Sequence, residues 1–185
     1  APRPVEHVKK IRKEMSWGYP LLGYGLTETN GVGCGNFTDN YLEKPTSTGP
    51  ATKPLVEVQM LDDDGNVLPQ GERGEVGIRT IANFNGYWNN EEATREAFTA
   101  DGFFKTGDVG RVDARGYVCI VGRSKDLIIS GGYNVYPAEI EGFINELPGV
   151  AESALVGVPH PDFGEVGVAV VIAKPGATLN ADQII

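Results

Sequence analysis

Glycine is the residue that most constrains what this chain can fold into. The sequence holds 25 glycines among 185 residues, about twice the ordinary share of ~7%. They stand in clusters rather than at a fixed period, which excludes a collagen-like helix and low-complexity sequence. Glycine takes the left-handed conformations of tight turns without steric cost. The chain is therefore predicted to be rich in turns, or in backbone that closely approaches a ligand.

Alternating apolar and polar residues between turn sequences predict β-strands in the middle of the chain. Residues 54–61 alternate in this way, the turn sequence DDDGN follows, and a second extended stretch covers 67–80. These two segments predict a hairpin. Residues 107–122 predict two more strands joined by a turn at 113–116. Nearer the N-terminus, residues 18–35 pass from a short apolar piece into glycine-dense sequence, which predicts a buried strand that leads into a loop.

Helical patterns are predicted near both ends and in the middle of the chain. Residues 4–15 carry helix formers, Pro4 suits the first turn, and one apolar face is expected to pack on a core through Val5, Val8, Ile11 and Met15. Residues 90–98 begin with asparagine, a good N-cap, and two acidic residues follow it. Residues 137–147 predict a third helix, and Asn180 is expected to cap the start of a further one.

The tetrapeptide Arg123–Asp126 (RSKD) is a charged break between two apolar segments. Beyond it, a strand, the helix over 137–147 and the apolar segments 150–158 and 166–173 follow in order. This β, α, β, β pattern predicts a small α+β unit that begins afresh. The sequence therefore predicts an α/β fold of mixed α+β character, with a domain boundary at the break.

The charge balance restricts the partners. Acidic residues outnumber basic ones by 25 to 16, which gives a formal net charge of −9, and no run of Lys and Arg stands out. Duplex nucleic acid and anionic membranes are therefore poor candidate partners for the surface as a whole. The longest apolar run, residues 166–173, is too short for a bilayer, which takes ~20 residues.

Cysteine and histidine usage bears on metals and on the compartment. Cys34, Cys119, His7 and His160 do not form the close pairs that a structural zinc site needs. The two cysteines leave open a single disulfide or two free thiols, and free thiols in a reducing cytosol are expected. Since the N-terminal sequence APRPVEHVKK lacks the apolar region of a signal peptide, a soluble cytoplasmic protein is predicted.

Three clusters could carry chemistry, and each has a purely structural alternative. Gly23–Glu28 could bring backbone N–H groups to an anion and a carboxylate to a divalent cation, or could simply form a glycine-rich turn. Lys105–Asp108 could grip a ribose diol through the aspartate, or the aspartate could cap a local turn. Residues 122–141 could bind a phosphate or ribose between domains, or could form a linker with surface charges.

The order and spacing of five motifs resolve these alternatives in favour of chemistry. They are YGLTE, GEVGIRT, NGYWNNEEATREAF, DGFFKTGDVG and GYVCIVGRSKDLIISGGYNVYPAEIE. In this order they closely resemble the adenylate-forming superfamily of acyl-CoA synthetases, carrier-loading adenylation domains and luciferases. The resemblance runs through essentially the whole chain. The sequence from Gly131 to Glu165 is most similar to the carboxylate–CoA ligase branch. Members of that branch activate a carboxylic acid with ATP and Mg²⁺ and transfer the acyl group to CoA.

The resemblance implies an ATP or AMP site in the first part of the chain. Tyr24 and Gly25 would lie along the nucleotide, with the tyrosine against adenine. Asp108 would hold the ribose hydroxyls, and Arg123 would add a cationic contact there.

Catalytic roles are implied at three positions. Thr27 would bond the α-phosphate, and Glu28 would ligate magnesium, which offsets the charge of the transferring phosphate. Lys125 would be the hinge about which a small C-terminal domain swings between adenylation and thioester formation.

The CoA site and the domain organisation are implied in the same way. Gly131, Gly132 and Tyr133 belong to the loop that would line the pantetheine tunnel. Residues 1–123 would form the C-terminal, β-rich part of the large domain, 124–126 the hinge, and 127–185 part of the small α+β domain. Ala1–Pro2 are similar to the tail of a GGAP segment that borders the nucleotide and acyl pocket.

The family's phosphate loop, which ends in Pro-Lys-Gly, and its general catalytic lysine are absent from residues 1–185. The chain is therefore expected to be an internal piece of a carboxylate–CoA ligase and to be inactive alone. Two alternatives stay open, an adenylation domain that loads a carrier protein and a non-catalytic nucleotide-binding module. Fatty, aryl and short dicarboxylic acids are all compatible with the sequence, which predicts no oligomeric state.

Overall fold

The computed structural model describes residues 5–15 and 17–184. It divides into two compact units, one that ends at Ile120 and one that begins at Val121, and each is described by itself. The predictions for Pro4 and for Ala1–Pro2 lie outside the described residues. Helices and sheets both occur, so the predicted mixed α/β fold class is confirmed. The division falls just before the predicted break at Arg123–Asp126, while the assignment of the two units to a large and a small enzyme domain stays a prediction.

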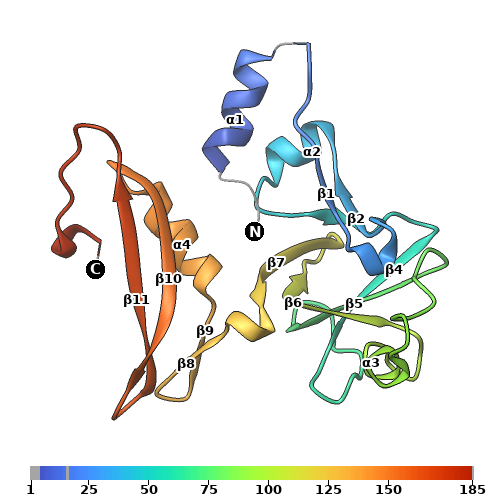
Figure 1. Cartoon of the computed structure of the whole chain (residues 1–185). Coiled ribbons are helices and arrows are strands. Elements are labelled where there is room, and N and C mark those ends of the chain that lie inside the picture. The colour runs from blue at the N-terminus through green and yellow to red at the C-terminus, as the bar shows by residue number, and fades with distance from the viewer. Residues whose placement is uncertain (1–4, 16, 185) are drawn as a thin grey trace. The chain divides into compact units, whose positions relative to one another are not determined.

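A five-stranded sheet with the order β3-β7-β6-β5-β4 organises the first unit (Figure 1). The strands are β3 (Gly49–Pro50), β4 (Val56–Leu61), β5 (Arg73–Thr80), β6 (Phe104–Val112) and β7 (Tyr117–Arg123). The predicted hairpin is present as β4 and β5, which pair antiparallel. Its second strand begins at Arg73 rather than at residue 67. Val67 and Leu68 still pair with the end of β4, but a turn closed by the hydrogen bond from the N–H of Glu72 to the carbonyl of Pro69 (3.2 Å) then interrupts the extended stretch.

The core of this unit lies between the sheet and the segment that carries YGLTE. Val56, Met60, Val76 and Ile78 form its buried centre, and Tyr24, Leu26 and Val32 pack against it. Burial of the apolar side chains on β4 and β5 therefore also fixes the backbone that follows β1 (Leu22–Tyr24).

The predicted buried strand within residues 18–35 is corrected by the structure. β1 is only half-buried and pairs antiparallel with β2 (Cys34–Asn36) in a separate two-stranded sheet. Leu21, just before it, is 59% exposed. The short apolar run indicated a strand correctly, but the extent of burial depends on what packs on its two faces.

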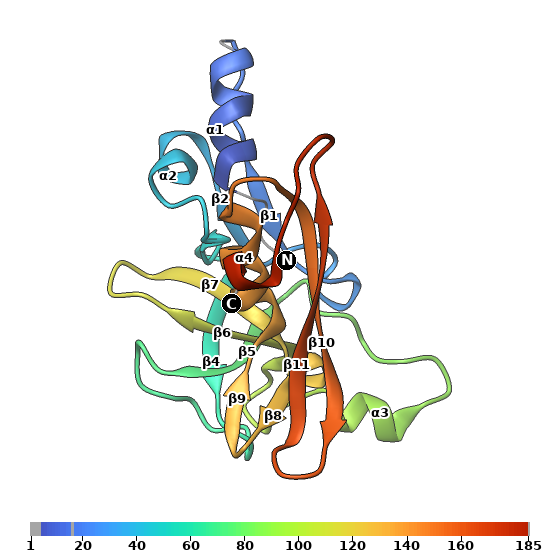
Figure 2. The ribbon, with the colours of Figure 1, turned by 90° about the vertical axis from the view of Figure 1, so that its left-hand side faces the viewer.

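Within residues 5–15 and 17–120, the first unit has three short α-helices. They are α1 (Val5–Glu14), α2 (Thr38–Glu43) and α3 (Glu91–Glu96). α3 begins as predicted, because the Asn90 side chain accepts a hydrogen bond from the N–H of Ala93 (3.1 Å). This helix lies in the connection between β5 and β6 (Figure 2). In α1, Val8 is fully buried but Met15, beyond the helix end, is 40% exposed, so the predicted apolar face is packed only in part.

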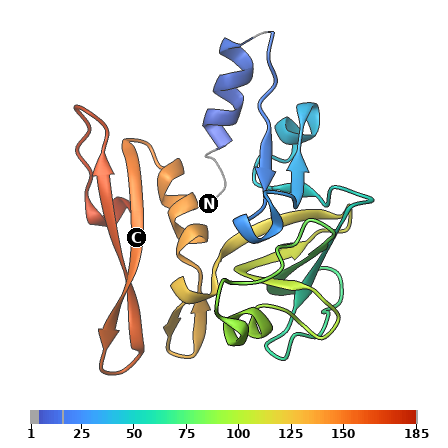
Figure 3. The ribbon, with the colours of Figure 1, turned by 45° about the vertical axis from the view of Figure 1, so that its right-hand side comes forward.

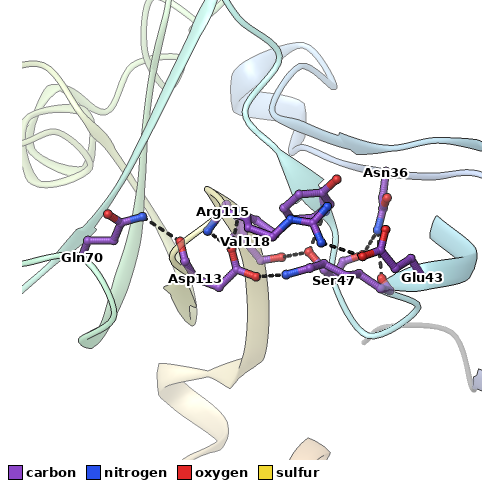
Figure 4. A network of polar contacts seen from close by, with 10 residues as sticks. Asn36, Glu43, Ser47, Gln70, Asp113, Arg115 and Val118 are labelled. Carbon is purple, nitrogen blue, oxygen red and sulfur yellow. Dashed lines mark hydrogen bonds and ion pairs between the residues drawn. The ribbon is translucent and has the colours of Figure 1, made fainter. Parts of the chain in front are cut away.

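A polar network ties α2 and the segment after it to the β6–β7 hairpin (Figure 4). Asp113 forms an ion pair with Lys44, and its backbone carbonyl accepts a hydrogen bond from Gln70 (2.7 Å). Arg115 pairs with Glu43 (2.6 Å) and lowers the pKa of that carboxyl by hydrogen bonding and by its positive charge. The buried hydroxyl of Ser47 donates to the carbonyl of Val118 (2.7 Å). The contacts of Glu43, Lys44 and Ser47 join segments about seventy residues apart, and the bond from Gln70 spans 43 residues.

The second unit contains a four-stranded sheet with the order β10-β11-β8-β9 (Figure 3). Its strands are β8 (Ile128–Ser130), β9 (Tyr133–Val135), β10 (Val150–His160) and β11 (Gly164–Ala173), and α4 (Pro137–Glu146) packs against β10. The predicted strand, helix and two following strands are present, but the structure adds β9, which pairs with β8 before the helix and was not predicted. Pro137 lies in the first turn of α4. Asn180 caps the short turn at Ala181–Gln183 by accepting the N–H of Asp182 (2.8 Å).

Two further predictions bear on the chain as a whole. Cys34 and Cys119 are free thiols, as expected. Burial raises the pKa of the Cys34 thiol to about 12, which keeps it protonated and unreactive at neutral pH. Among the described residues, no helix is long and apolar enough to cross a membrane.

Candidate functional site

The segment after β1 forms a tight turn that presents Thr27 and Glu28. Residues Thr27–Thr29 make a short 3₁₀ turn, and the hydroxyl of Thr29 both accepts from the N–H of Leu26 (3.0 Å) and donates to its carbonyl (3.1 Å). Asn30 and Gly31 follow with positive φ angles of 49° and 76° and reverse the chain. The turn is thus closed by its own hydrogen bonds, with Thr29 buried, Glu28 half-buried and Thr27 exposed.

Gly25 is required at the start of this turn by a close backbone approach. A Cβ atom built on Gly25 would lie 2.5 Å from the carbonyl group of Gly31, whereas a Cβ on Gly23 would meet nothing within 4 Å. The other side of the turn is equally close, because a Cβ on Gly33 would lie 2.3 Å from the carbonyl oxygen of Tyr24. The glycines of this motif therefore let two backbone segments touch.

Gly25→Ala is expected to destabilise the protein while Gly23→Ala is silent. The added methyl at position 25 forces the backbone at Gly31 to move, and overpacking of this kind costs about 1–3 kcal/mol. Thermal and urea unfolding of the two variants measure the difference, with Gly23→Ala as the matched control. Equal stability of the two variants would contradict the close approach.

Tyr24 and Asp108, which the sequence places in separate clusters, meet in the first unit. The Tyr24 hydroxyl donates a hydrogen bond of 2.8 Å to Oδ2 of Asp108. Asp108 is only 7% exposed. Burial and the Asp108 carboxylate both raise the pKa of Tyr24, so the phenol stays protonated as the donor. This bond joins residues 84 positions apart in the sequence, beyond any local turn.

The stretch of β6 that carries Asp108 is held at two points by β5. The hydroxyl of Thr106 accepts the N–H of Asp108 (3.2 Å) and donates to the carbonyl of Val76 on β5 (2.8 Å). Gly107 has a positive φ of 71°, and its N–H donates to Oε1 of Glu75 (2.8 Å). β5 therefore sets the position of the aspartate through a hydroxyl and a carboxylate.

Glu28 is held by the segment that precedes α3. Its backbone carbonyl accepts the N–H of Phe84 (2.7 Å), and its Oε1 accepts the hydroxyl of Tyr87 (3.0 Å). The ring of Tyr87 packs edge-on against Phe84 with centroids 4.8 Å apart. Burial and the neighbouring Glu28 carboxylate raise the pKa of Tyr87, so this hydroxyl also stays protonated and donates.

Glu28 fits magnesium as a single carboxylate ligand, with substrate phosphates and water as the other ligands. Among the described residues there is no group of three or more His, Cys, Asp or Glu side chains that could enclose a metal ion. Mg²⁺ does not need one, since it commonly binds through one or two carboxylates and completes its shell with substrate phosphates and water. The half-buried Glu28 carboxylate can supply such a ligand.

The remaining predicted site residues lie in the second unit or at its start. Arg123 ends β7 with an exposed side chain, and Lys125 lies exposed in the short 3₁₀ turn Ser124–Asp126. Gly131 and Gly132 have positive φ angles of 55° and 84° and form the β8–β9 turn, next to Tyr133, which is 78% exposed.

The β10–β11 turn holds this glycine pair in place. The N–H of Gly131 donates to the carbonyl of Phe163 (2.9 Å), and a Cβ on Gly131 would lie 3.1 Å from the Phe163 ring. Oε2 of Glu165 accepts the N–H of Ile129 (3.2 Å). The glycine turn is thus a built loop rather than a free linker.

Four residues of these sites were missed by reasoning on the sequence, namely Glu75, Tyr87, Thr106 and Glu165. Glu75, Tyr87 and Thr106 lie inside the quoted motifs, and Glu165 ends the stretch from Gly131 to Glu165, so these positions were available as a signal. Their partners are 30 to 59 residues away, and no local pattern identifies such a pair.

Comparison with known proteins gives matches over most of the chain. The sequence profile described as "AMP-binding enzyme" matches residues 1–88, and that described as "AMP-binding enzyme C-terminal domain" matches residues 139–185. A 3-[(3aS,4S,7aS)-7a-methyl-1,5-dioxo-octahydro-1H-inden-4-yl]propanoyl:CoA ligase of Rhodococcus jostii is 43% identical over 98% of this chain and 33% of its own length. The long-chain-fatty-acid–CoA ligase FadD13 of Mycobacterium tuberculosis is 47% identical over 83% of this chain and 30% of its own.

A solved structure agrees with these relatives. The crystal structure of ATP-bound MatB from Rhodopseudomonas palustris matches with a TM-score of 0.88 and 42% identity, over all of this chain and 36% of that one. The chain thus spans about a third of the length of the proteins it matches.

Proposed function

Because this chain belongs to the AMP-binding enzyme family, we propose that it forms the nucleotide- and thiol-handling part of an AMP-forming acid–thiol ligase. The whole protein would activate a carboxylic acid with ATP and pass the acyl group to CoA. The observation that carries this proposal is the hydrogen bond between Tyr24 and Asp108, because it joins the YGLTE and KTGD segments into one place in the first unit. The names of the relatives, which are CoA ligases, support CoA as the acceptor.

The proposed adenosine site uses both partners of that bond. Asp108 offers carboxylate oxygens to the ribose hydroxyls, and charge-assisted bonds of this kind are about twice as strong as neutral ones. Tyr24 keeps the carboxylate oriented and places its ring against the base, with Gly25 allowing the backbone to pass close by. Arg123 supplies a positive charge to the nucleotide.

In the proposed reaction the acyl group is first joined to AMP and is then transferred to CoA. A carboxylate oxygen attacks the α-phosphorus of ATP, the bond to the bridging oxygen of the β-phosphate breaks, and pyrophosphate leaves. The thiol sulfur of CoA, after loss of its proton, attacks the acyl carbon, and AMP leaves with its phosphate oxygen. The Thr27 hydroxyl donates a hydrogen bond to the α-phosphate and so stabilises the negative charge that develops there.

A magnesium ion held by Glu28 would lower the negative charge on the phosphates during the first step. The protein's own contribution is to keep the Glu28 carboxylate in place, through the turn and through Tyr87.

For the second step we propose that Lys125 is the hinge and that the loop of Gly131, Gly132 and Tyr133 receives the pantetheine arm of CoA. Support comes from the built β8–β9 turn, which the β10–β11 turn fixes. We also place the protein in the cytoplasm, since two free thiols suit a reducing compartment.

The function is tested with the whole protein and a panel of carboxylic acids that includes fatty, aryl and short dicarboxylic members. ATP–pyrophosphate exchange measures the first step, and release of AMP together with the acyl-CoA thioester measures the second. Both reactions are expected with at least one acid. Exchange without thioester would indicate a carrier protein as the acceptor, and no ATP binding at all would contradict the proposal.

The 185-residue chain alone is expected to be inert in ATP–pyrophosphate exchange with any carboxylate. Residues 1–185 lack the Pro-Lys-Gly phosphate loop expected from the family resemblance, and electrostatic stabilisation of the transferring group is usually the largest catalytic contribution. The assay is incorporation of labelled pyrophosphate into ATP, with the whole protein as the positive control. Exchange by the purified chain that disappears on Glu28→Ala would contradict this expectation.

A further inference from the structure

The segment of residues 82–87 is fastened to the Glu28 turn at three points. Asn30 donates to the carbonyl of Ala82 (2.7 Å), Phe84 donates to the carbonyl of Glu28 (2.7 Å), and Tyr87 donates to the Glu28 side chain (3.0 Å). The first two contacts fix the backbone of residues 82–84 to the turn that carries Glu28. The third contact is made to the Glu28 carboxylate itself.

The position of Tyr87 is itself well determined. Its backbone N–H donates to the hydroxyl of Thr94 in α3 (2.9 Å), and its ring packs edge-on against Phe84. Phe84 in turn packs against the rings of Phe98 and Phe104, each at a centroid distance of 5.7 Å. The Tyr87 hydroxyl therefore approaches Glu28 from a packed aromatic cluster rather than from a loose loop.

The hydrogen bond from Tyr87 is accepted by Oε1 of Glu28 and so competes with a cation for that oxygen. This competition favours a carboxylate that binds a cation through one oxygen. Mg²⁺ accepts such ligands readily, because it needs near-octahedral geometry and keeps several waters, whereas Ca²⁺ takes more ligands and readily accepts both oxygens of one carboxylate. Partners of ligating carboxylates commonly change metal affinity by about 10–100-fold when they are removed.

We propose that Tyr87 is a positioning residue that holds Glu28 as a one-oxygen ligand and thereby favours Mg²⁺ over Ca²⁺. The inference rests on the proposed role of Glu28 as the metal ligand of an ATP-dependent ligase. It adds a specificity-determining residue that contacts the carboxylate rather than the cation.

Metal binding to the whole protein, with a non-hydrolysable ATP analogue present, tests the proposal. Mn²⁺ serves as the probe in place of Mg²⁺ and is followed by electron paramagnetic resonance, and Ca²⁺ is measured by its displacement of Mn²⁺. Tyr87→Phe removes the hydroxyl and keeps the ring contacts. It is expected to weaken Mn²⁺ binding by about tenfold and Ca²⁺ binding by less than about threefold, because Ca²⁺ gains access to Oε1.

Tyr19→Phe is the matched control, since Tyr19 is a half-exposed tyrosine that lies beside Arg12, and it is expected to leave both affinities unchanged. Glu28→Ala distinguishes the metal role of Glu28 from the positioning role of Tyr87. If Glu28→Ala weakens Mn²⁺ binding but Tyr87→Phe leaves the ratio of Mn²⁺ to Ca²⁺ affinity unchanged, the role of Tyr87 is wrong and the proposed function stands. If Glu28→Ala has no effect on Mn²⁺ binding, the metal role of Glu28 fails and the role of Tyr87 fails with it.

Discussion

Lys125→Pro in the whole protein is expected to leave formation of the acyl-adenylate largely intact and to reduce thioester formation by orders of magnitude. Lys125 lies exposed in the 3₁₀ turn Ser124–Asp126, which is closed by a long hydrogen bond (3.4 Å) from the N–H of Leu127 to the carbonyl of Ser124. A hinge works through changes of φ and ψ at a few residues. Proline fixes φ near −65° and also restricts the residue before it, so it favours one orientation of the two units.

The control for this prediction is Lys125→Ala, which removes the charge and keeps the backbone free. Both half-reactions are expected to stay within about tenfold of the unchanged protein, ~1.4 kcal/mol. Adenylation is followed by pyrophosphate exchange, and thioester formation by adding CoA to preformed acyl-adenylate. Equal loss of both steps in the proline variant would identify RSKD as a passive linker.

Asp108→Ala is expected to weaken ATP binding by about 10–100-fold while it changes the preference among acids little. A charge-assisted hydrogen bond contributes about 1.5–3 kcal/mol, and Asp108 is expected to accept at least one from the ribose. The same carboxylate accepts the Tyr24 hydroxyl, so its loss also disturbs the residue that is proposed to lie against the base. Calorimetry of ATP binding to the whole protein measures the effect.

Two comparisons separate ribose binding from a structural role of Asp108. Tyr24→Phe removes the hydrogen bond and leaves the carboxylate, so ATP should bind more tightly to it than to Asp108→Ala. ATP and its deoxyribose analogues should differ in affinity for the unchanged protein and become alike for Asp108→Ala. If Asp108→Ala lowers thermal stability but binds ATP with unchanged affinity, the carboxylate serves only to hold Tyr24.

Local chemistry in the sequence was sufficient for most elements of the fold. Asn90 caps α3, the DDDGN turn joins β4 to β5, and Pro137 starts α4, because caps, turns and alternation act over a few residues. The same is true of the break at Arg123–Asp126, which lies next to the division between the two compact units. Burial was harder to predict, and β1 is half-buried because it pairs with β2 alone in a small separate sheet.

The candidate residues were readable in the sequence as motif members, but their arrangement was not. The bonds from Tyr24 to Asp108, from Tyr87 to Glu28 and from Gly107 to Glu75 span 84, 59 and 32 residues. Each depends on how the chain between the partners folds back. For Gly107 on β6 and Glu75 on β5, a one-residue shift of register would also turn the Glu75 side chain to the other face of the sheet. The sequence by itself thus determined which groups are available for the proposed nucleotide chemistry. Tertiary structure decided which groups meet, because contacts at such separations form only when distant segments of the chain pack together.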